Sequence, residues 1–324
     1  MRAIRRMLAL AGVVVLAAGC GGEGSGSGAE EGGGGRLSIA TGGTSGVYFV
    51  YGGGLAKVIS SNLEGYRATA ETTSASVDNL ILINDGGSDI AFTLGDTAID
   101  AVEGREAFKE PVPMRALAQI YDNYTQVVAK AGSDIKTIED LKGKRVSVGA
   151  PNSGTEVIAD RVLEAAGMDP KGDIKRQGLG VEESVQAMKD GSIDAFFWSG
   201  GLPTGAITDL VTQQKITMLD TTVYTDKLTE KYGDVYRDET IPKGTYKGVT
   251  KDVPTIAVPN FLVVSEKMDE KLAFDLTKLL FDRKDDLVAV HPEAKNLDPQ
   301  RAAEVISPIE LHPGAKRYFD EQGA

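Results

Sequence analysis

The sequence contains few of the side chains that hold metal ions or act as catalytic nucleophiles. Its 324 residues include one cysteine, Cys20, and two histidines, His291 and His312. A single cysteine excludes an internal disulfide, and neither histidine has a partner at the spacing of a zinc site. We therefore predict that the protein uses no metal and no cofactor.

Basic residues are scarce relative to acidic ones. The chain has 35 Lys and Arg against 47 Asp and Glu, and its formal net charge is −12 at pH 7. Such a surface repels nucleic acid, and no segment resembles a basic groove. A small anionic ligand would have to be bound by local backbone N–H groups and helix N-termini, because salt screens the global field within about 8 Å.

No apolar run is long enough to span a membrane. The longest, residues 7–18, follows three arginines and has twelve residues, whereas a membrane helix needs about 20. This pattern predicts a signal peptide over residues 1–19. It ends at Leu16-Ala17-Ala18-Gly19-Cys20, which predicts a bacterial lipobox with Cys20 lipidated, although Leu16 stands four residues before the cysteine instead of three. The alternative is ordinary cleavage after small residues, with Cys20 incidental.

The segment after the predicted cleavage point favours the lipid anchor. Beyond Cys20, residues 21–35 are almost all Gly, Ser, Ala and Glu. Such a segment is a flexible coil with an r.m.s. reach of roughly 20 Å. Residues 20–35 are thus predicted to tether an extracytoplasmic protein to the cell membrane through its lipidated N-terminus.

The rest of the chain contains a diverged internal repeat. A strand-like segment, a Gly-rich turn, a helix, a second loop and helix, and a short strand occur twice in the same order. Ser45 and Ser153 are 108 residues apart, as are Ser76 and Ser184, and Asp85 and Asp190 are 105 apart. This period exceeds that of solenoid repeats, so the pattern predicts two α/β lobes with a cleft between them.

The lobes are predicted to exchange segments. Lobe 1 comprises residues 36–124 and 260–324, and lobe 2 comprises residues 125–259. Strands near residues 119–128 and 255–264 are predicted to cross between the lobes and to act as the hinge when ligand binding closes them.

The strand-to-helix loops are the candidate binding site. Residues 41–46 and 152–155 occupy equivalent places in the repeat and expose N–H groups and hydroxyls at helix N-termini, which suit a carboxylate or phosphate. The alternative is that Ser45 and Ser153 only cap helices.

Trp198, the only tryptophan, is followed by glycines and is predicted to form a wall of the cleft rather than a core ring. Neither histidine lies in these loops, so no serine has a base beside it and we predict no enzymatic activity.

Several separated motifs resemble one family. They are Ala40-Thr41-Gly42-Gly43-Thr44-Ser45-Gly46-Val47-Tyr48, Val77-Asp78-Asn79-Leu80, Gly149-Ala150-Pro151-Asn152-Ser153-Gly154-Thr155-Glu156, Ala195-Phe196-Phe197-Trp198-Ser199-Gly200-Gly201-Leu202-Pro203, Ile241-Pro242-Lys243-Gly244-Thr245-Tyr246 and Leu311-His312-Pro313-Gly314-Ala315. In this order they resemble the TAXI family of TRAP transporter solute-binding proteins, and the match covers nearly everything after residue 36.

The resemblance implies a type II periplasmic-binding-protein fold that closes on a small carboxylate or amino acid, such as glutamate, glutamine or 2-oxoglutarate. The protein would deliver this ligand to a TRAP-type membrane permease. Carried over by position, the implied ligand-binding residues are Thr44, Ser45, Gly46 and Tyr48 in lobe 1 and Asn152, Ser153, Gly154, Thr155, Trp198 and Gly201 in lobe 2. No arginine stands in these loops, so neutral donors are expected to dominate. The alternatives are a binding lipoprotein of an ABC transporter and one of a sensor system.

Overall fold

The computed structural model describes residues 34–324, which are built on one ten-stranded mixed sheet. The predicted signal peptide, Cys20 and nearly all of the tether lie outside the described residues. The strands are β1 (Gly35–Ala40), β2 (Tyr66–Glu71), β3 (Ile90–Leu94), β4 (Met114–Lys130), β5 (Arg145–Ser147), β6 (Lys175–Gln177), β7 (Ala195–Gly200), β8 (Ile216–Met218), β9 (Arg237–Ile241) and β10 (Val253–Ser265). Their order is β2-β1-β3-β10-β4-β7-β5-β6, with β8 against β4 and β9 against β10.

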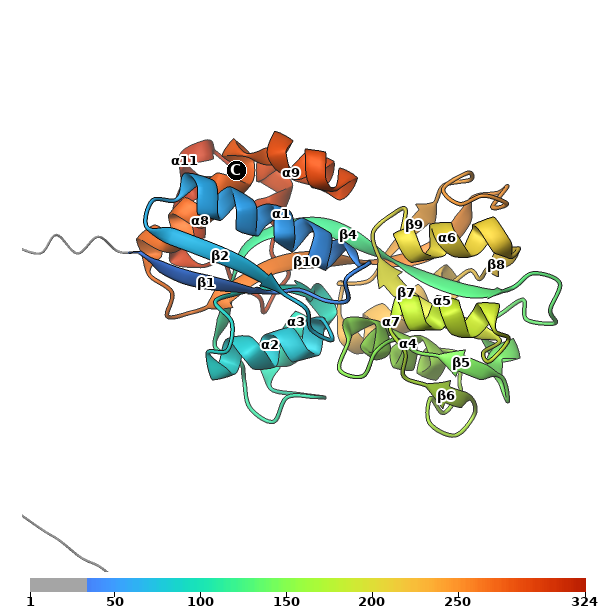
Figure 1. Ribbon diagram of the computed structural model, residues 1–324. Helices are drawn as coiled ribbons and strands as arrows, with labels where there is room; N and C mark the ends of the chain where they lie inside the picture. Colours follow the sequence, from blue (N-terminus) through green and yellow to red (C-terminus); the bar gives the residue numbers. More distant parts are fainter. Residues whose placement is uncertain (1–33) are drawn as a thin grey trace, which may run out of the picture. The chain divides into compact units, whose positions relative to one another are not determined.

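Helices cover both faces of this sheet (Figure 1). The α-helices are α1 (Val47–Asn62), α2 (Ser76–Asp85), α3 (Gly95–Glu103), α4 (Gly154–Ala165), α5 (Val181–Lys189), α6 (Gly205–Gln213), α7 (Thr225–Tyr232), α8 (Glu270–Asp282), α9 (Lys284–Val290), α10 (Pro299–Ala303) and α11 (Pro313–Gln322). Short 3₁₀ turns are η1 (Glu139–Leu141), η2 (Thr222–Tyr224) and η3 (Pro292–Asn296).

Two hydrophobic cores cover the part of the sheet that contains β1, β2 and β3. One face packs against α1, α8, α9 and α11, whose apolar side chains join those of β1, β3 and β10. Figure 1 shows these helices together on one side of β1 and β2, with α2 and α3 on the other. The second core lies under α2, α3 and α4. Within residues 34–324 no helix is both long and apolar enough to cross a membrane.

The predicted internal repeat is present as two β-α-β-α-β units. In β1-α1-β2-α2-β3 the first strand lies between the other two and is parallel to both, and β5-α4-β6-α5-β7 repeats this arrangement. Gly86 and Gly191, after α2 and α5, both have φ of +70°, a conformation that favours glycine at the end of a helix. The structure thus confirms two α/β lobes.

The two aspartates that precede β3 and β7 serve the same structural purpose in each lobe. Asp89 Oδ2 accepts a hydrogen bond from the backbone N–H of Ser38 in β1, at 2.8 Å. Asp194 Oδ2 accepts one from the N–H of Arg145 in β5, at 2.9 Å. Both carboxylates therefore tie one strand to the next, and neither lies at the cleft.

The exact pairing of serines across the repeat was wrong. Helices α1 and α4 begin at Val47 and Gly154, which are 107 residues apart, and α2 and α5 begin at Ser76 and Val181, which are 105 apart. Gly46 is therefore the equivalent of Ser153, and Ser184 lies inside α5 rather than at its start. The sequence pattern also predicts Ser76 as an N-cap, but Ala75 holds that position and Ser76 Oγ accepts from the N–H of Leu94 at 3.1 Å.

Two strands run through both lobes. β4 pairs with β10 along most of its length, and from Tyr124 onward it also pairs with β7. β10 pairs with β9 through Ala257 and with β3 from Asn260. The predicted lobe boundaries, at residues 124/125 and 259/260, fall inside these strands. We propose that they are the hinge.

The sequence pattern predicts two separate strand-like segments at 114–120 and 126–129, a short helix within residues 133–141 and one helix over 269–286, and the structure corrects all three. The segments 114–120 and 126–129 belong to one continuous strand, β4, because the polar residues between them pair with β10. The predicted helix before β5 is only the 3₁₀ turn η1. The predicted helix over 269–286 ends at Asp282, and α9 starts after a break at Arg283.

Candidate functional site

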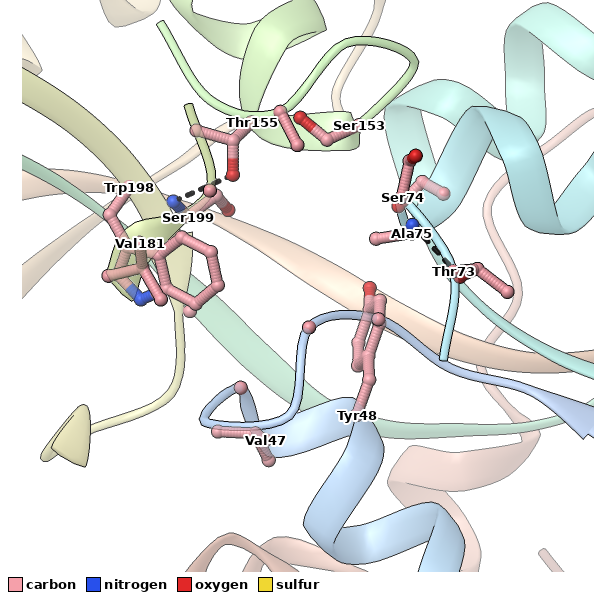
Figure 2. Close-up of a pocket in the computed structure, with 18 of the residues that line it drawn as sticks. Val47, Tyr48, Thr73, Ser74, Ala75, Ser153, Thr155, Val181, Trp198 and Ser199 are labelled. Carbon is pink, nitrogen blue, oxygen red and sulfur yellow. Dashed lines mark hydrogen bonds between the residues drawn. The ribbon is translucent and has the colours of Figure 1, made fainter. Parts of the chain in front are cut away.

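A cavity of about 510 Å³ lies between the lobes. Residues 42–44, 46–48 and 72–76 and Leu94 at the end of β3 line it from lobe 1. Residues 150–151, 153–155 and 178–183 and the end of β7, residues 198–200, line it from lobe 2, and Tyr121 and Asn123 of β4 line it where that strand passes between the lobes. Figure 2 shows Tyr48, Thr73 and Ser74 on one side of this space, with Trp198 and Val181 on another. Of the ten predicted ligand-binding residues, seven line the cavity: Thr44, Gly46, Tyr48, Ser153, Gly154, Thr155 and Trp198.

The lobe 1 wall is the turn from β1 into α1. Gly46 is the N-cap of α1, and no side chain caps this helix. Tyr48 is buried, its ring lies 5.2 Å from that of Phe92, and its hydroxyl donates to Asn260 Oδ1 of β10. Burial holds the pKa of Tyr48 far above its usual range, so the hydroxyl stays protonated.

Ser45 does not line the cavity. Its Oγ is buried and has no hydrogen-bond partner among the described residues. The physical reason is that α1 starts one residue later than the repeat spacing predicts, so that Gly46 takes the capping position and Ser45 precedes it. Thr44 remains at the cavity, where its Oγ1 donates to Glu182 Oε1 of lobe 2 at 3.1 Å.

The lobe 2 wall is the N-terminus of α4. Ser153 is its N-cap, and Oγ accepts from the N–H of Glu156 at 3.1 Å. Thr155 Oγ1 accepts from the N–H of Ser199 at 3.2 Å, which ties the helix to the end of β7. A Cβ on Gly154 would lie 2.4 Å from Leu94 Cδ1 of lobe 1, so only glycine permits this approach of the lobes.

Asn152 and Gly201 lie outside the cavity lining. Asn152 has φ of +63°, and its carbonyl turns toward lobe 1, where it accepts from the N–H of Asp78 at 3.2 Å. Gly201 faces the other way, because a Cβ there would lie 2.7 Å from Glu293 Oε1. Both residues belong to contacts between the lobes rather than to the cavity.

Trp198 forms part of the wall, as predicted from its flanking glycines. The indole Nε1 donates to Thr204 Oγ1 at 2.9 Å, and the side chain is only half-buried. A Cβ on Gly200 would lie 2.3 Å from Nε1, and one on Gly46 would lie 3.6 Å from the ring's far edge. The ring therefore needs a glycine at position 200, whereas a Cβ at position 46 would make only an ordinary van der Waals contact with it.

The prediction missed the loop 178–183 as a cavity wall. Gly178, Leu179, Gly180, Val181, Glu182 and Glu183 all line the cavity. In the repeat this loop is the counterpart of residues 72–76, which line the cavity from lobe 1. The sequence therefore contained a signal for this wall of the cavity. Two glycines, Gly178 and Gly180, precede a helix that begins with an apolar residue, and such glycines indicate that the backbone approaches another group closely.

The electrostatics of the cavity come mainly from backbone groups. Among the described residues that line it there is no lysine or arginine, and the only ionisable acids are Glu182 and Glu183. The N-termini of α1, α2, α4 and α5 all reach it, and α1, α2 and α5 have no side-chain cap. The first N–H groups of a helix lack intrahelical acceptors and carry partial positive charge. These groups can bind an anion without a cationic side chain.

The two histidines act as helix caps in lobe 1. His291 Nδ1 accepts from the N–H of Glu293, and His312 Nδ1 accepts from the N–H of Gly314, both at 3.2 Å. Burial lowers the pKa of each imidazole, so both are neutral at pH 7. In the part of the chain that the structure describes, no group of three or more His, Cys, Asp or Glu is placed to hold a metal ion.

Comparison with known proteins identifies the family. Residues 39–323 match the model of the NMT1-like family. The chain belongs to the NMT1-like family. The match spans both lobes and all the loops around the cavity, so the cavity is built entirely from the family's own segments. The match does not test the resemblance to TAXI receptors, which belongs to the proposal below.

Solved structures share the fold. A protein from Bordetella bronchiseptica RB50 is 17% identical, with a TM-score of 0.51 over 89% of this chain and 80% of that one. The periplasmic aliphatic sulphonate binding protein SsuA from Escherichia coli is 15% identical, with a TM-score of 0.45 over 88% and 82%. A putative L-cystine ABC transporter protein from Listeria monocytogenes is 16% identical, with a TM-score of 0.44 over 81% and 94%. At 17% identity the likeness to the Bordetella bronchiseptica protein concerns the fold alone, and the strand pairing of this chain itself confirms the predicted two-lobed α/β class.

The different environments of Ser45 and Ser153 lead to a prediction. We expect Ser153→Ala to lower the free energy of unfolding by about 1 kcal/mol, because it removes the N-cap of α4. Ser45→Ala should change it little, since that hydroxyl has no partner to lose. Urea denaturation of both variants measures the difference. Equal losses would show that Ser45 also caps a helix, contrary to the structure.

Proposed function

We propose that the protein is an extracytoplasmic solute receptor that binds a small carboxylate or amino acid and delivers it to a membrane permease. The observation that carries the proposal is the convergence of four helix N-termini on one cavity between two lobes. An anionic group placed there would accept hydrogen bonds from unpaired N–H groups and lie at the positive ends of the helix dipoles.

The shape of the cavity supports a ligand with an acidic group and a carbon body. Hydroxyl-bearing residues, Thr73, Ser74 and Ser153, lie on part of its wall, and Trp198 and Val181 lie on another part (Figure 2). Glutamate, glutamine and 2-oxoglutarate, which the TAXI resemblance implies, have this character. The volume of about 510 Å³ leaves room for a ligand of this size together with water.

The experiment is native mass spectrometry of protein purified without refolding, followed by calorimetry with any acid that co-purifies. We expect a mass shift that corresponds to one small organic acid, and weaker binding in Ser153→Ala than in Ser45→Ala, because only Ser153 lines the cavity. The loss should be about 0.5–3 kcal/mol, the range between a neutral hydrogen bond and one to a charged group. Binding only of solutes that carry no carboxylate or other acidic group would contradict the proposal.

The permease is proposed to be of the TRAP type, with an ABC-type permease as the alternative. The motifs around residues 40–48, 149–156 and 195–203 favour a TRAP-type permease, whereas the two-lobed fold is compatible with either type. Crosslinking in native membranes, with identification of the captured partner, distinguishes a sodium-driven permease from a transporter with an ATPase subunit. Capture of a sensor protein instead would assign the receptor to signalling.

The lipid anchor is tested by Cys20→Ser. We expect the variant to be released from membranes, because Cys20 is the only acylation site in the sequence and the segment after it has no apolar residue run. Membrane and supernatant fractions, separated after a salt wash, measure the release. Retention equal to that of the parent protein would show that Cys20 is incidental, as the alternative cleavage pattern requires.

A further inference from the structure

A buried charged cluster joins the two lobes away from the cavity. Arg161 of α4, in lobe 2, is 4% exposed and forms ion pairs with Asp96 and Asp100 of α3, in lobe 1, each 1% exposed. The contact to Asp96 Oδ2 is 3.6 Å, and Asp100 Oδ2 accepts directly from Nη2. None of the three residues lines the cavity.

Arg161 is held firmly by its own lobe. Its Nη1 donates to the hydroxyl of Tyr236 at 2.9 Å, and that hydroxyl donates in turn to Asp96 Oδ2 at 2.9 Å. The guanidinium carbon lies 3.9 Å from the centre of the Tyr232 ring, a cation–π contact. The guanidinium is thus fixed in lobe 2, and the two carboxylates that it meets belong to lobe 1.

The cluster and the cavity are connected through the same elements. Helix α4 lines the cavity with Gly154 and Thr155 and carries Arg161 two turns further on. β3 lines the cavity with Leu94, and α3 follows it directly. A movement that separates the start of α4 from the end of β3 therefore also separates Arg161 from α3.

We infer that Arg161 is a positioning residue that keeps the lobes closed around the cavity without contacting the ligand. Loss of its guanidinium leaves Asp96 and Asp100 buried, and among residues 34–324 Arg105 is then the one cation still paired with Asp100. Buried carboxylates without a counter-charge are costly, and separation of the lobes returns them to water. This inference does not depend on which ligand or permease the protein serves.

The test uses Arg161→Met and a matched control, Arg176→Met. Arg176 also pairs with two carboxylates, Glu156 and Asp160 of α4, but all three residues belong to lobe 2. Trp198 is the only tryptophan and lies at the cavity, so quenching of its fluorescence by iodide reports access to the cavity. Small-angle scattering gives the radius of gyration of the same samples.

We expect the open-to-closed ratio to rise about tenfold or more in Arg161→Met, the factor that corresponds to about 1.4 kcal/mol. Iodide quenching and the radius of gyration should both increase, while Arg176→Met matches the parent protein. Equal quenching and equal radii in the two variants would overturn the inference, because they would show that the cluster only stabilises the fold.

Two milder variants keep the test valid if Arg161→Met does not fold. Arg161→Lys keeps the charge and should restore part of the closed population. Tyr236→Phe removes the hydroxyl that links Arg161 to Asp96 and should increase quenching less than Arg161→Met does. Parent-like quenching and scattering in both milder variants would likewise contradict the role of Arg161.

Discussion

Replacement of Gly314 by alanine is expected to lower the free energy of unfolding by about 3 kcal/mol, at the upper end of the usual cost of overpacking. Gly314 lies in the first turn of α11, where this helix contacts α8. A Cβ there would lie 2.1 Å from the carbonyl oxygen of Glu270 and 2.7 Å from the backbone nitrogen of Phe274. Because backbone atoms cannot rotate away as side chains do, the two helices must move apart.

The matched control is Gly53→Ala in α1. Gly53 is exposed, and a Cβ there would meet nothing within 4 Å. Alanine should stabilise this helix by up to about 1 kcal/mol, because glycine is the poorer helix former. Urea denaturation of both variants gives opposite signs if the packing is as described. Parent-like stability of Gly314→Ala would mean that α8 and α11 are further apart than in the structure.

Asp100 is expected to make stability fall as the pH rises between about 4 and 6. Burial raises the pKa of Asp100 from 3.8 to about 6, against the attraction of Arg161. In this window the folded protein holds a proton that the unfolded chain has lost, so rising pH favours unfolding. This loss of stability is absent at pH values below the pKa of Asp100 in the unfolded chain and complete above its pKa in the folded protein. A difference of about two pKa units corresponds to about 3 kcal/mol.

Asp100→Asn removes this titration. The free energy of unfolding of the variant minus that of the parent should therefore rise by about 3 kcal/mol from pH 4 to pH 7. Asp194→Asn is the control, because hydrogen bonds from Arg145 lower the pKa of Asp194, so that its folded-state titration lies below its ordinary range. For Asp194→Asn the difference should be flat above about pH 5, where the carboxyl is ionised in both the folded and the unfolded state. Denaturant melts at a series of pH values measure both, and a flat Asp100→Asn difference would show that Arg161 outweighs burial.

The sequence by itself determined the architecture, because local signals and the repeat agree. The order of strands, Gly-rich turns and helices occurs twice, and a strand followed by a helix and a parallel strand can pack in few ways. The two helix-ending glycines, Gly86 and Gly191, and the strand-linking aspartates, Asp89 and Asp194, lie at equivalent places in both lobes. The loops at the same ends of the two units face each other. The repeat in the sequence therefore predicted where the cavity lies.

The tertiary structure decided which side chains face that cavity. A shift of one residue in the start of α1 takes Ser45 off the lining, and such a shift depends on how the helix docks on its sheet rather than on residue type. Asn152 and Gly201 are turned toward the opposite lobe by contacts with Asp78 and Glu293, residues distant in the sequence. The pairing of Arg161 with α3 has the same origin. Contacts between lobes depend on how two folded units fit together, and no local pattern in the chain encodes that fit.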